Sequence, residues 1–177
     1  MRKLSHKILL RRIEGTKGLN NLTNTEASML AMALDSDGCI SAEESTNRDY
    51  YSPVFVFGGS SILPLELARR YGETVYNKTP KGSNSEIHPY TWQISKQKSL
   101  KKFLLQIRPY VILKWKQVDI ALKMLEVLEI KSEGWKKKLV KLGSDMGYAN
   151  KAYKNPDIDI DEYMEVGYLE HIRIMPC

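Results

Sequence analysis

The chain has 177 residues, 42% of them apolar and 27% charged, and its formal charge of +6 permits nucleic-acid binding without establishing it. No apolar run is long enough for a membrane span, and no apolar block follows the basic N-terminal residues as in a signal peptide. Two cysteines, Cys39 and Cys177, exclude a disulfide framework and a cysteine-based zinc site, so we expect a reducing, intracellular location.

The first expected elements are a basic arm and an apolar helix. Residues 1–24 form the arm, which reads as an extended segment or a short helix and ends in a Gly/Asn/Thr-rich linker. Thr23 or Thr25 can cap a helix over residues 26–36, with Glu26 in the first turn, where the helix dipole favours a carboxylate. This helix is apolar nearly all round, which predicts burial on two sides, and it ends at Gly38.

Short strands and helices alternate after this glycine. Strands are expected at 39–43, 54–57, 74–78 and 90–95, and helices at 62–71, 100–107, 111–129 and 135–143. The order α-β-β-α-β-β-α, with helices appended, predicts an α+β core at residues 25–130 and a C-terminal helical extension and tail at 131–177. Four strand residues are expected to face the core: Val54, Val56, Trp92 and Ile94.

The segment Leu-Ala-Met-Ala-Leu-Asp-Ser-Asp-Gly at residues 30–38 delivers two carboxylates to the C-terminal end of an apolar helix. That end already carries partial negative charge, which makes carboxylates there electrostatically unfavourable. A divalent cation would explain them, because it binds carboxylates and free backbone carbonyls. A polar turn without chemistry is an equally good explanation of Asp-x-Asp-Gly by itself.

Two other acidic motifs fit less well. The haloacid-dehalogenase phosphatases also use Asp-x-Asp-Gly, but after a Val/Ile-rich strand and with Thr after the glycine, where this chain has Cys39. An EF-hand loop counted from Asp35 has Thr46 at its twelfth position instead of Glu. The acidic run near the C-terminus lacks the EF-hand glycine and predicts a solvated loop: Asp157, Asp159 and Asp161.

Residues 30–38 resemble the LAGLIDADG motif in register, and several later segments resemble that family in the same order. They are residues 52–57 followed by 65–72, residues 90–95 followed by 100–104, and Ile-Arg-Pro-Tyr at 107–110 followed by Lys114 and Gln117. The resemblance covers about residues 26–128. It implies the αββαββα homing-endonuclease fold, in which a curved antiparallel sheet forms a DNA-binding saddle.

The resemblance also implies an activity. A homing endonuclease of this type makes a double-strand break with short 3′ overhangs in a long, pseudo-palindromic DNA site, and it originates from a mobile intron or intein. The chain has one motif, so cutting two strands requires a homodimer. Mg²⁺ is the expected cofactor; Mn²⁺ would substitute, and Ca²⁺ would support binding only. An RNA maturase and a catalytically inactive DNA-binding regulator on the same fold remain alternatives.

Individual residues receive roles from the same resemblance. Asp37 matches the catalytic metal ligand, and the backbone carbonyl of Ser36 matches the ligand beside it. Asp35 matches the first Asp of the motif, which is usually structural, and is kept as a secondary candidate ligand. Lys98 matches the basic residue near the attacking water, with Lys96 as its alternative. The implied dimer interface is Ala27, Leu30, Ala31, Met32 and Leu34. The residues expected to contact DNA are Ser41, Glu43, Ser60, Asn77, Lys78, Lys81, Asn84, Gln93, Ser95, Lys114 and Lys116.

Two places depart from the family pattern, and the first is Met32, at the motif position that is usually Gly. The second strand ends in Gly58-Gly59, where the family often has a polar residue that positions water. The role is then unfilled, or it passes to Ser60 or Ser61. This substitution is the feature that keeps a binding-only protein among the alternatives.

Overall fold

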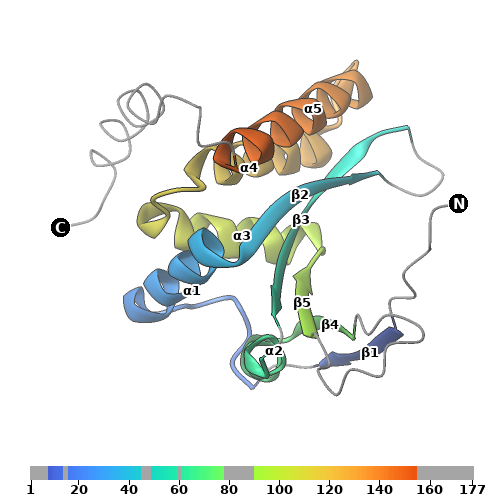
Figure 1. Ribbon diagram of the computed structural model, residues 1–177. Coiled ribbons are helices and arrows are strands. Elements are labelled where there is room, and N and C mark those ends of the chain that lie inside the picture. Colours follow the sequence, from blue (N-terminus) through green and yellow to red (C-terminus); the bar gives the residue numbers. More distant parts are fainter. Residues whose placement is uncertain (1–7, 14–15, 45–48, 60, 78–89, 155–177) are drawn as a thin grey trace, which may run out of the picture.

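The computed structural model describes residues 8–13, 16–44, 49–59, 61–77 and 90–154. They form one antiparallel sheet with strand order β1-β4-β5-β3-β2 and helices packed against it (Figure 1). The predicted α+β order is confirmed. The strands are β1 (Ile8–Ile13), β2 (Gly38–Glu44), β3 (Tyr51–Gly59), β4 (Glu73–Asn77) and β5 (Tyr90–Ile94). The helices are α1 (Asn24–Ser36), α2 (Leu63–Tyr71), α3 (Gln97–Ile107), the short 3₁₀ helix η1 (Arg108–Tyr110), α4 (Trp115–Ile130) and α5 (Trp135–Lys154).

The two faces of the sheet are set by the register between β3 and β5. Phe55 pairs with Ile94 and Phe57 with Trp92, and all four side chains are buried against the helices. Val56 pairs with the next residue of β5 and therefore lies on the opposite, open face. Trp92 and Ile94 face the core as predicted. The prediction for Val56 was wrong by one residue of register, because residues 54–57 are apolar at every position and alternation gives no signal. Val54 lies on the same face as Val56 but is only 3% exposed, so it is buried as predicted.

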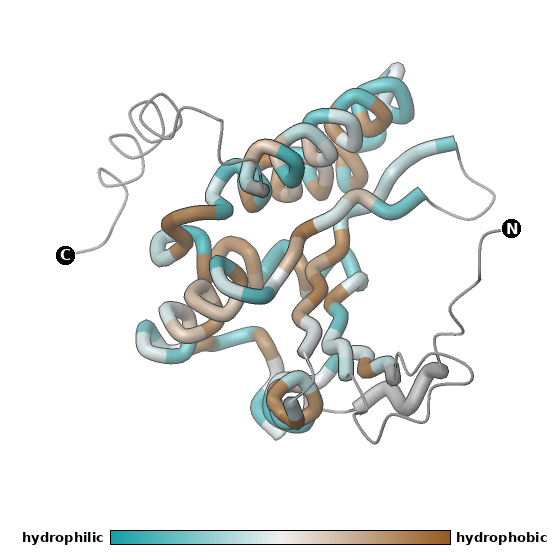
Figure 2. Tube along the Cα trace, viewed as in Figure 1, coloured by the Kyte–Doolittle hydropathy of each residue, from teal (hydrophilic) through white to brown (hydrophobic). Residues whose placement is uncertain are grey.

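The interior is aromatic at its centre. The Phe55 ring packs edge-on against Trp92 and Phe103, at centroid distances of 5.5 and 4.8 Å. Figure 2 shows apolar residues on both the strands and the helices where the two layers meet. No helix among the described residues is long and apolar enough to cross a membrane.

The expected N-terminal arm contains an edge strand. β1 pairs antiparallel with β4, from Ile13 opposite Glu73 to Ile8 opposite Asn77. The backbone N–H of Thr16 then donates to the carbonyl of Arg69 at 3.0 Å, which joins the chain to the end of α2. Part of the segment described from sequence as an arm is thus a component of the sheet.

The start of α1 is fixed by a polar cluster around Glu26. Thr23 and Glu26 form a capping box, and the Glu26 carboxylate accepts bonds from Lys17, from Arg70 at 2.7 Å and from Tyr71 at 3.3 Å. The bond from Lys17, followed by the Thr23 backbone and Arg70, holds the pKa of Glu26 far below its usual value. The cluster ties α1 to the loop before it and to the end of α2.

The last helix is longer than predicted. α5 continues through Gly143, where the sequence suggested an end, and reaches Lys154. A Cβ on Gly143 would lie 2.8 Å from the ring of Tyr51, so this glycine serves close packing between α5 and β3 and does not end the helix. Leu139 and Met146 of α5 are buried in the main core.

Candidate active site

The acidic end of α1 is the turn where the helix becomes β2. Asp37 is the C-cap residue; its backbone N–H donates to the carbonyl of Ala33 at 3.2 Å, and its side chain is exposed. Gly38 begins β2 immediately afterwards. A Cβ there would lie 2.6 Å from the Cα of Leu34, so only glycine allows the strand to start this close to the helix. The turn therefore holds one carboxylate at the surface beside the last carbonyls of the helix.

The other carboxylate of the motif has a structural role. Asp35 is 8% exposed, and its two oxygens accept bonds from the backbone N–H groups of Ile112 at 2.7 Å and Lys114 at 2.9 Å. These bonds tie the end of α1 to the segment that leads into α4. These contacts give Asp35 an anchoring role, and metal binding by this side chain stays a prediction.

A buried lysine lies under the same turn. Lys114 is 5% exposed, and its Nζ donates to the carbonyls of Leu34 at 2.7 Å, Gly38 at 2.9 Å, Asp35 at 3.1 Å and Ser36 at 3.3 Å. An ammonium at this position compensates the partial negative charge of the helix end. The expectation that Lys114 contacts DNA is therefore corrected: this side chain is enclosed within the chain and supports the acidic end of α1.

Helix α5 also reaches this site. The Tyr153 hydroxyl donates to the Asp35 carbonyl at 2.9 Å, and the Lys114 Nζ lies 4.6 Å from the centre of the Tyr153 ring. Asn150 donates from Nδ2 to the Ile40 carbonyl at 2.9 Å. The sequence analysis missed both residues, since they follow the segment covered by the resemblance and no spacing links them to α1.

The two lysines assigned to catalysis lie at the start of α3. Lys96 is the N-cap of α3, and Lys98 lies in its first turn; both are exposed. The pKa of Glu129, in the last turn of α4, is lowered by its ion pair with Lys101 and additionally by the charge of Lys98. Lys114 precedes α4, so its Cα lies about 22 Å from that of Glu129 at the helical rise per residue. The structure places Lys114 beside the acidic end of α1, and the catalytic role of Lys98 stays a prediction.

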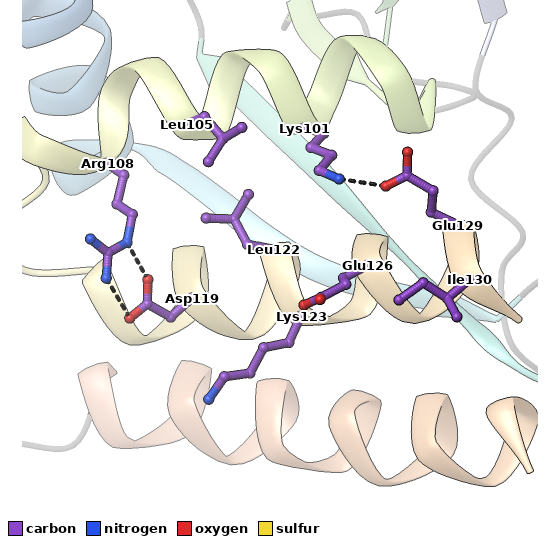
Figure 3. Close-up of a pocket in the computed structure, with 9 residues that line it drawn as sticks. All are labelled: Lys101, Leu105, Arg108, Asp119, Leu122, Lys123, Glu126, Glu129 and Ile130. Atoms are coloured by element: carbon purple, nitrogen blue, oxygen red, sulfur yellow. Dashed lines mark hydrogen bonds and ion pairs between the residues drawn. The ribbon is translucent and has the colours of Figure 1, made fainter. Parts of the chain in front are cut away.

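A groove of about 460 Å³ lies between α3 and α4 (Figure 3). Arg108 holds Asp119 with bonds of 2.7 and 3.2 Å in the groove, and Lys101 pairs with Glu129 (Figure 3). These two carboxylates are neutralised by neighbouring cations. Two ion pairs therefore bridge the helices that form the groove.

The open face of the sheet carries several of the residues expected to contact DNA. Ser41 and Glu43 pair with Val54 and Ser52, which places them on the face of Val56, and Glu43 is exposed. Gln93 lies on the same face, opposite Val56, but is only 6% exposed.

The remaining expected DNA contacts fall in three places. Ser95 is exposed just after β5. Lys116 lies in the first turn of α4, with its Nζ 5.4 Å from the Trp115 ring centre, and so belongs to the helical layer. Four of the others lie outside the described residues: Ser60, Lys78, Lys81 and Asn84. Asn77 ends β4, but its side chain is not described.

Of the two serines that could replace the family's water-positioning residue at Gly58-Gly59, the structure describes Ser61. Ser61 is exposed, and its Oγ accepts a bond from the backbone N–H of Leu63 at 3.4 Å at the start of α2. Both glycines are half-buried at the end of β3. A polar side chain is therefore missing from this strand end.

The exposed face of α1 differs from the predicted dimer interface. Met32 is 69% exposed, as an interface residue of a free chain would be, and Met29 on the same helix is 63% exposed. The other four residues of the predicted interface are at most 3% exposed and pack inside their own chain. They are Ala27, Leu30, Ala31 and Leu34.

The fold resembles that of known DNA-cleaving proteins. Neither a protein-family model nor a curated protein sequence matches the chain. A crystal structure of the homing endonuclease I-CvuI in complex with its target, in the presence of Ca, matches with a TM-score of 0.57 and 21% identity, over 71% of this chain and 82% of that one.

Two further structures match less well. I-CvuI in complex with the I-CreI target in the presence of Mg, with the DNA not cleaved, has a TM-score of 0.49 and 18% identity over 74% of this chain and 96% of that one. The group I intron-encoded homing endonuclease I-CeuI, complexed with DNA, has a TM-score of 0.43 and 17% identity over 88% and 68%. The first match shows that this chain has the homing-endonuclease fold, as its motif predicts.

Proposed function

We propose that this chain is a site-specific DNA endonuclease of the LAGLIDADG type, which acts as a homodimer and uses a divalent cation to cut both strands of a long, pseudo-palindromic site. The observation that carries the proposal is the acidic end of α1. An exposed carboxylate stands there beside helix-end carbonyls, in a chain that has the homing-endonuclease fold. The DNA-bound I-CvuI structure supports double-stranded DNA as the ligand.

The donor atoms at this site suit a hard cation. Asp37 offers an exposed carboxylate and Ser36 a backbone carbonyl, and oxygen is the donor that Mg²⁺ prefers. Among the described residues there is no group of three acidic, His or Cys side chains around a metal position. Mg²⁺ sites on phosphate substrates commonly use one or two carboxylates and complete their shell with phosphate oxygens and water.

The chain's own residues would position the reaction. Asp37 and the Ser36 carbonyl would hold the cation against the scissile phosphate, while Lys114 keeps the turn rigid from below and Asp35 anchors it to the start of α4. The bound cation would supply an activated water and stabilise the leaving 3′ oxygen. Lys98, with Lys96 as its alternative, remains the proposed basic residue near the attacking water.

Two copies of α1 would meet through their exposed methionines. Met29 and Met32 stand one helical turn apart and leave a large apolar surface in water. Burying both against the same residues of a second chain would contribute about 1.5–3 kcal/mol per side chain. A twofold axis through this contact would bring two copies of Asp37 together, one for each strand of the duplex.

A DNA-binding regulator is the second candidate. The observation that favours it is Gly58-Gly59, which leaves the end of β3 without a polar side chain to hold water. A regulator would keep the fold, the dimer and the open face of the sheet, and it would bind duplex DNA without cutting it. An RNA maturase would instead prefer structured RNA to every duplex.

The decisive experiment is selection from a random duplex library, in parallel with Mg²⁺ and with Ca²⁺. We expect cleaved sites with Mg²⁺ and bound, uncut sites of the same sequence with Ca²⁺. Asp37→Asn should abolish cutting but leave binding intact, and Asp145→Asn, which removes an exposed carboxylate from α5, should change neither. Binding in both ions without any cut product would establish the regulator and overturn the nuclease.

A further inference from the structure

The outer face of α5 carries basic side chains around an exposed tyrosine. The helix contains six lysines and a single acidic residue, Asp145. Five of its residues are spaced four, three, four and three positions apart, which places them on one face of an α-helix. This α5 stripe consists of Lys137, Lys141, Ser144, Tyr148 and Lys151.

The α5 stripe points into solvent. It lies on the side of the helix opposite Leu139, Met146 and Ala149, which are buried in the core. All five residues of the stripe are exposed, and Tyr148 is 74% exposed. Figure 2 shows hydrophilic and apolar residues alternating along this helix, as expected for a helix with one buried face.

The positive charge of the stripe is not compensated. No ion pair involves its three lysines within the part of the chain that the structure describes; the one salt bridge formed by an α5 lysine joins Lys136 to Asp49 at 4.0 Å. A tyrosine with three-quarters of its surface in water and no packing role costs solvation free energy. Both features suit a ligand with negative charge and flat apolar faces.

This surface is separate from the open face of the sheet. α5 packs with its buried side on α4, β2 and β3, in the helical layer (Figure 1). The stripe is turned away from that contact, so a ligand bound to it would leave the open face of the sheet free. Between Lys137 and Lys151 it extends for about 21 Å at the α-helical rise.

We propose that the α5 stripe is a second nucleic-acid-binding surface, and that it takes single-stranded nucleic acid. Lysine ammonium groups neutralise backbone phosphates in any nucleic acid. Tyr148 selects the single strand, because an exposed aromatic ring stacks on an unpaired base, whereas a duplex hides the faces of its bases. The proposal goes beyond cleavage of a duplex at α1 and does not depend on it.

Two other occupants have less support. A second copy of the stripe would bring lysine against lysine. The segment after Lys154 has the complementary charge, with four carboxylates among residues 155–162, and begins where α5 ends. It also contains the aromatic residues Tyr163 and Tyr168, but it lacks the repeating phosphates of a nucleic acid, and the experiment below tests it directly.

The test is fluorescence anisotropy of labelled 20-nucleotide single strands of DNA and of RNA, with the full chain in EDTA at several salt concentrations. Lys141→Gln/Lys151→Gln should weaken single-strand binding about tenfold and reduce the slope of log affinity against log salt by about 1.4, at 0.7 per phosphate contact. Tyr148→Ala should weaken binding about tenfold without changing the slope, because stacking releases no counterions. The DNA and RNA arms show which strand is preferred.

The matched control is Lys102→Gln/Lys123→Gln, which removes two exposed lysines from α3 and α4 and should leave single-strand binding within about twofold. Equal losses in the control and stripe variants would overturn the proposal, since charge alone would then explain binding. So would a full chain that binds no single strand. If only a chain ending at Lys154 bound it, residues 155–177 would be the occupant, and the proposal would be wrong for the full chain.

Discussion

Replacing the buried lysine under the acidic end of α1 tests the central structural argument. Lys114→Met keeps the length of the side chain and removes the ammonium that donates to four carbonyls. Those of Leu34 and Gly38, at 2.7 and 2.9 Å, belong to buried residues and gain no water in exchange. The substitution should therefore destabilise the fold at the start of β2.

The size of the expected loss in stability follows from the carbonyls of Leu34 and Gly38. Each loses a charge-assisted bond at about 1–3 kcal/mol, and removal of the ammonium relieves part of its own desolvation cost, so we expect a net loss of about 3 kcal/mol in the free energy of unfolding. For a chain of this size that corresponds to a drop of about 6–12 °C in Tm.

Thermal unfolding followed by circular dichroism measures this loss, with duplex binding in Ca²⁺ as a second readout below Tm. The control is Lys123→Met on α4, which removes an exposed lysine and should change Tm by no more than about 2 °C. A Lys114→Met protein with the Tm of the unchanged chain would refute the argument. It would mean that the helix-end carbonyls do not need the ammonium.

Three further predictions concern packing, pH and assembly. Gly143→Ala should cost about 1–3 kcal/mol in urea unfolding, because its Cβ would meet the Tyr51 ring at 2.8 Å, and Tyr51→Leu in the same chain should recover part of the loss. Glu26 has a lowered folded-state pKa, so its stabilising contribution is complete above its unfolded pKa of about 4.5 and is lost as pH falls below it. Glu26→Gln should therefore flatten the acid limb of the plot of unfolding free energy against pH. An unchanged acid limb would contradict the role of Glu26. Met32→Glu should convert a dimer to a monomer in analytical ultracentrifugation without lowering Tm, whereas Leu105→Glu, at a similarly exposed position of α3, should leave the mass unchanged; a dimer in both would refute the α1 interface.

Much of the fold could be predicted from local signals. The apolar helix, its Thr23–Glu26 cap and the glycine that ends it are all encoded within a few residues. The exceptions involve partners distant in sequence. β1 pairs with β4 some 60 residues later, and its alternating pattern is obscured by Arg11 and Arg12. Gly143 was interpreted as a helix end because its packing against Tyr51 cannot be seen from the sequence around it.

The candidate site shows the same difference between local signals and partners distant in sequence. A motif locates the turn and the exposed Asp37, because both depend on the order of adjacent residues. The resemblance gives Asp35 a mainly structural role, but the motif does not identify its partners, which are the amides of Ile112 and Lys114. The motif also does not identify Lys114 as the cation under the turn, because which lysine reaches α1 depends on how α4 packs.

The charges at the end of α1 form a consistent arrangement. A helix C-terminus next to two carboxylates would be strongly negative, and an isolated chain would be destabilised by it. Backbone amides stabilise the Asp35 carboxylate by hydrogen bonds. The Lys114 ammonium, which lies against the Tyr153 ring, donates to the carbonyls at the helix end. Asp37 is then the carboxylate of this turn that still faces solvent. A divalent cation bound to Asp37 would have a ligand whose surroundings are already neutral and rigid. The free-energy cost of positioning that carboxylate is covered during folding, before DNA binds.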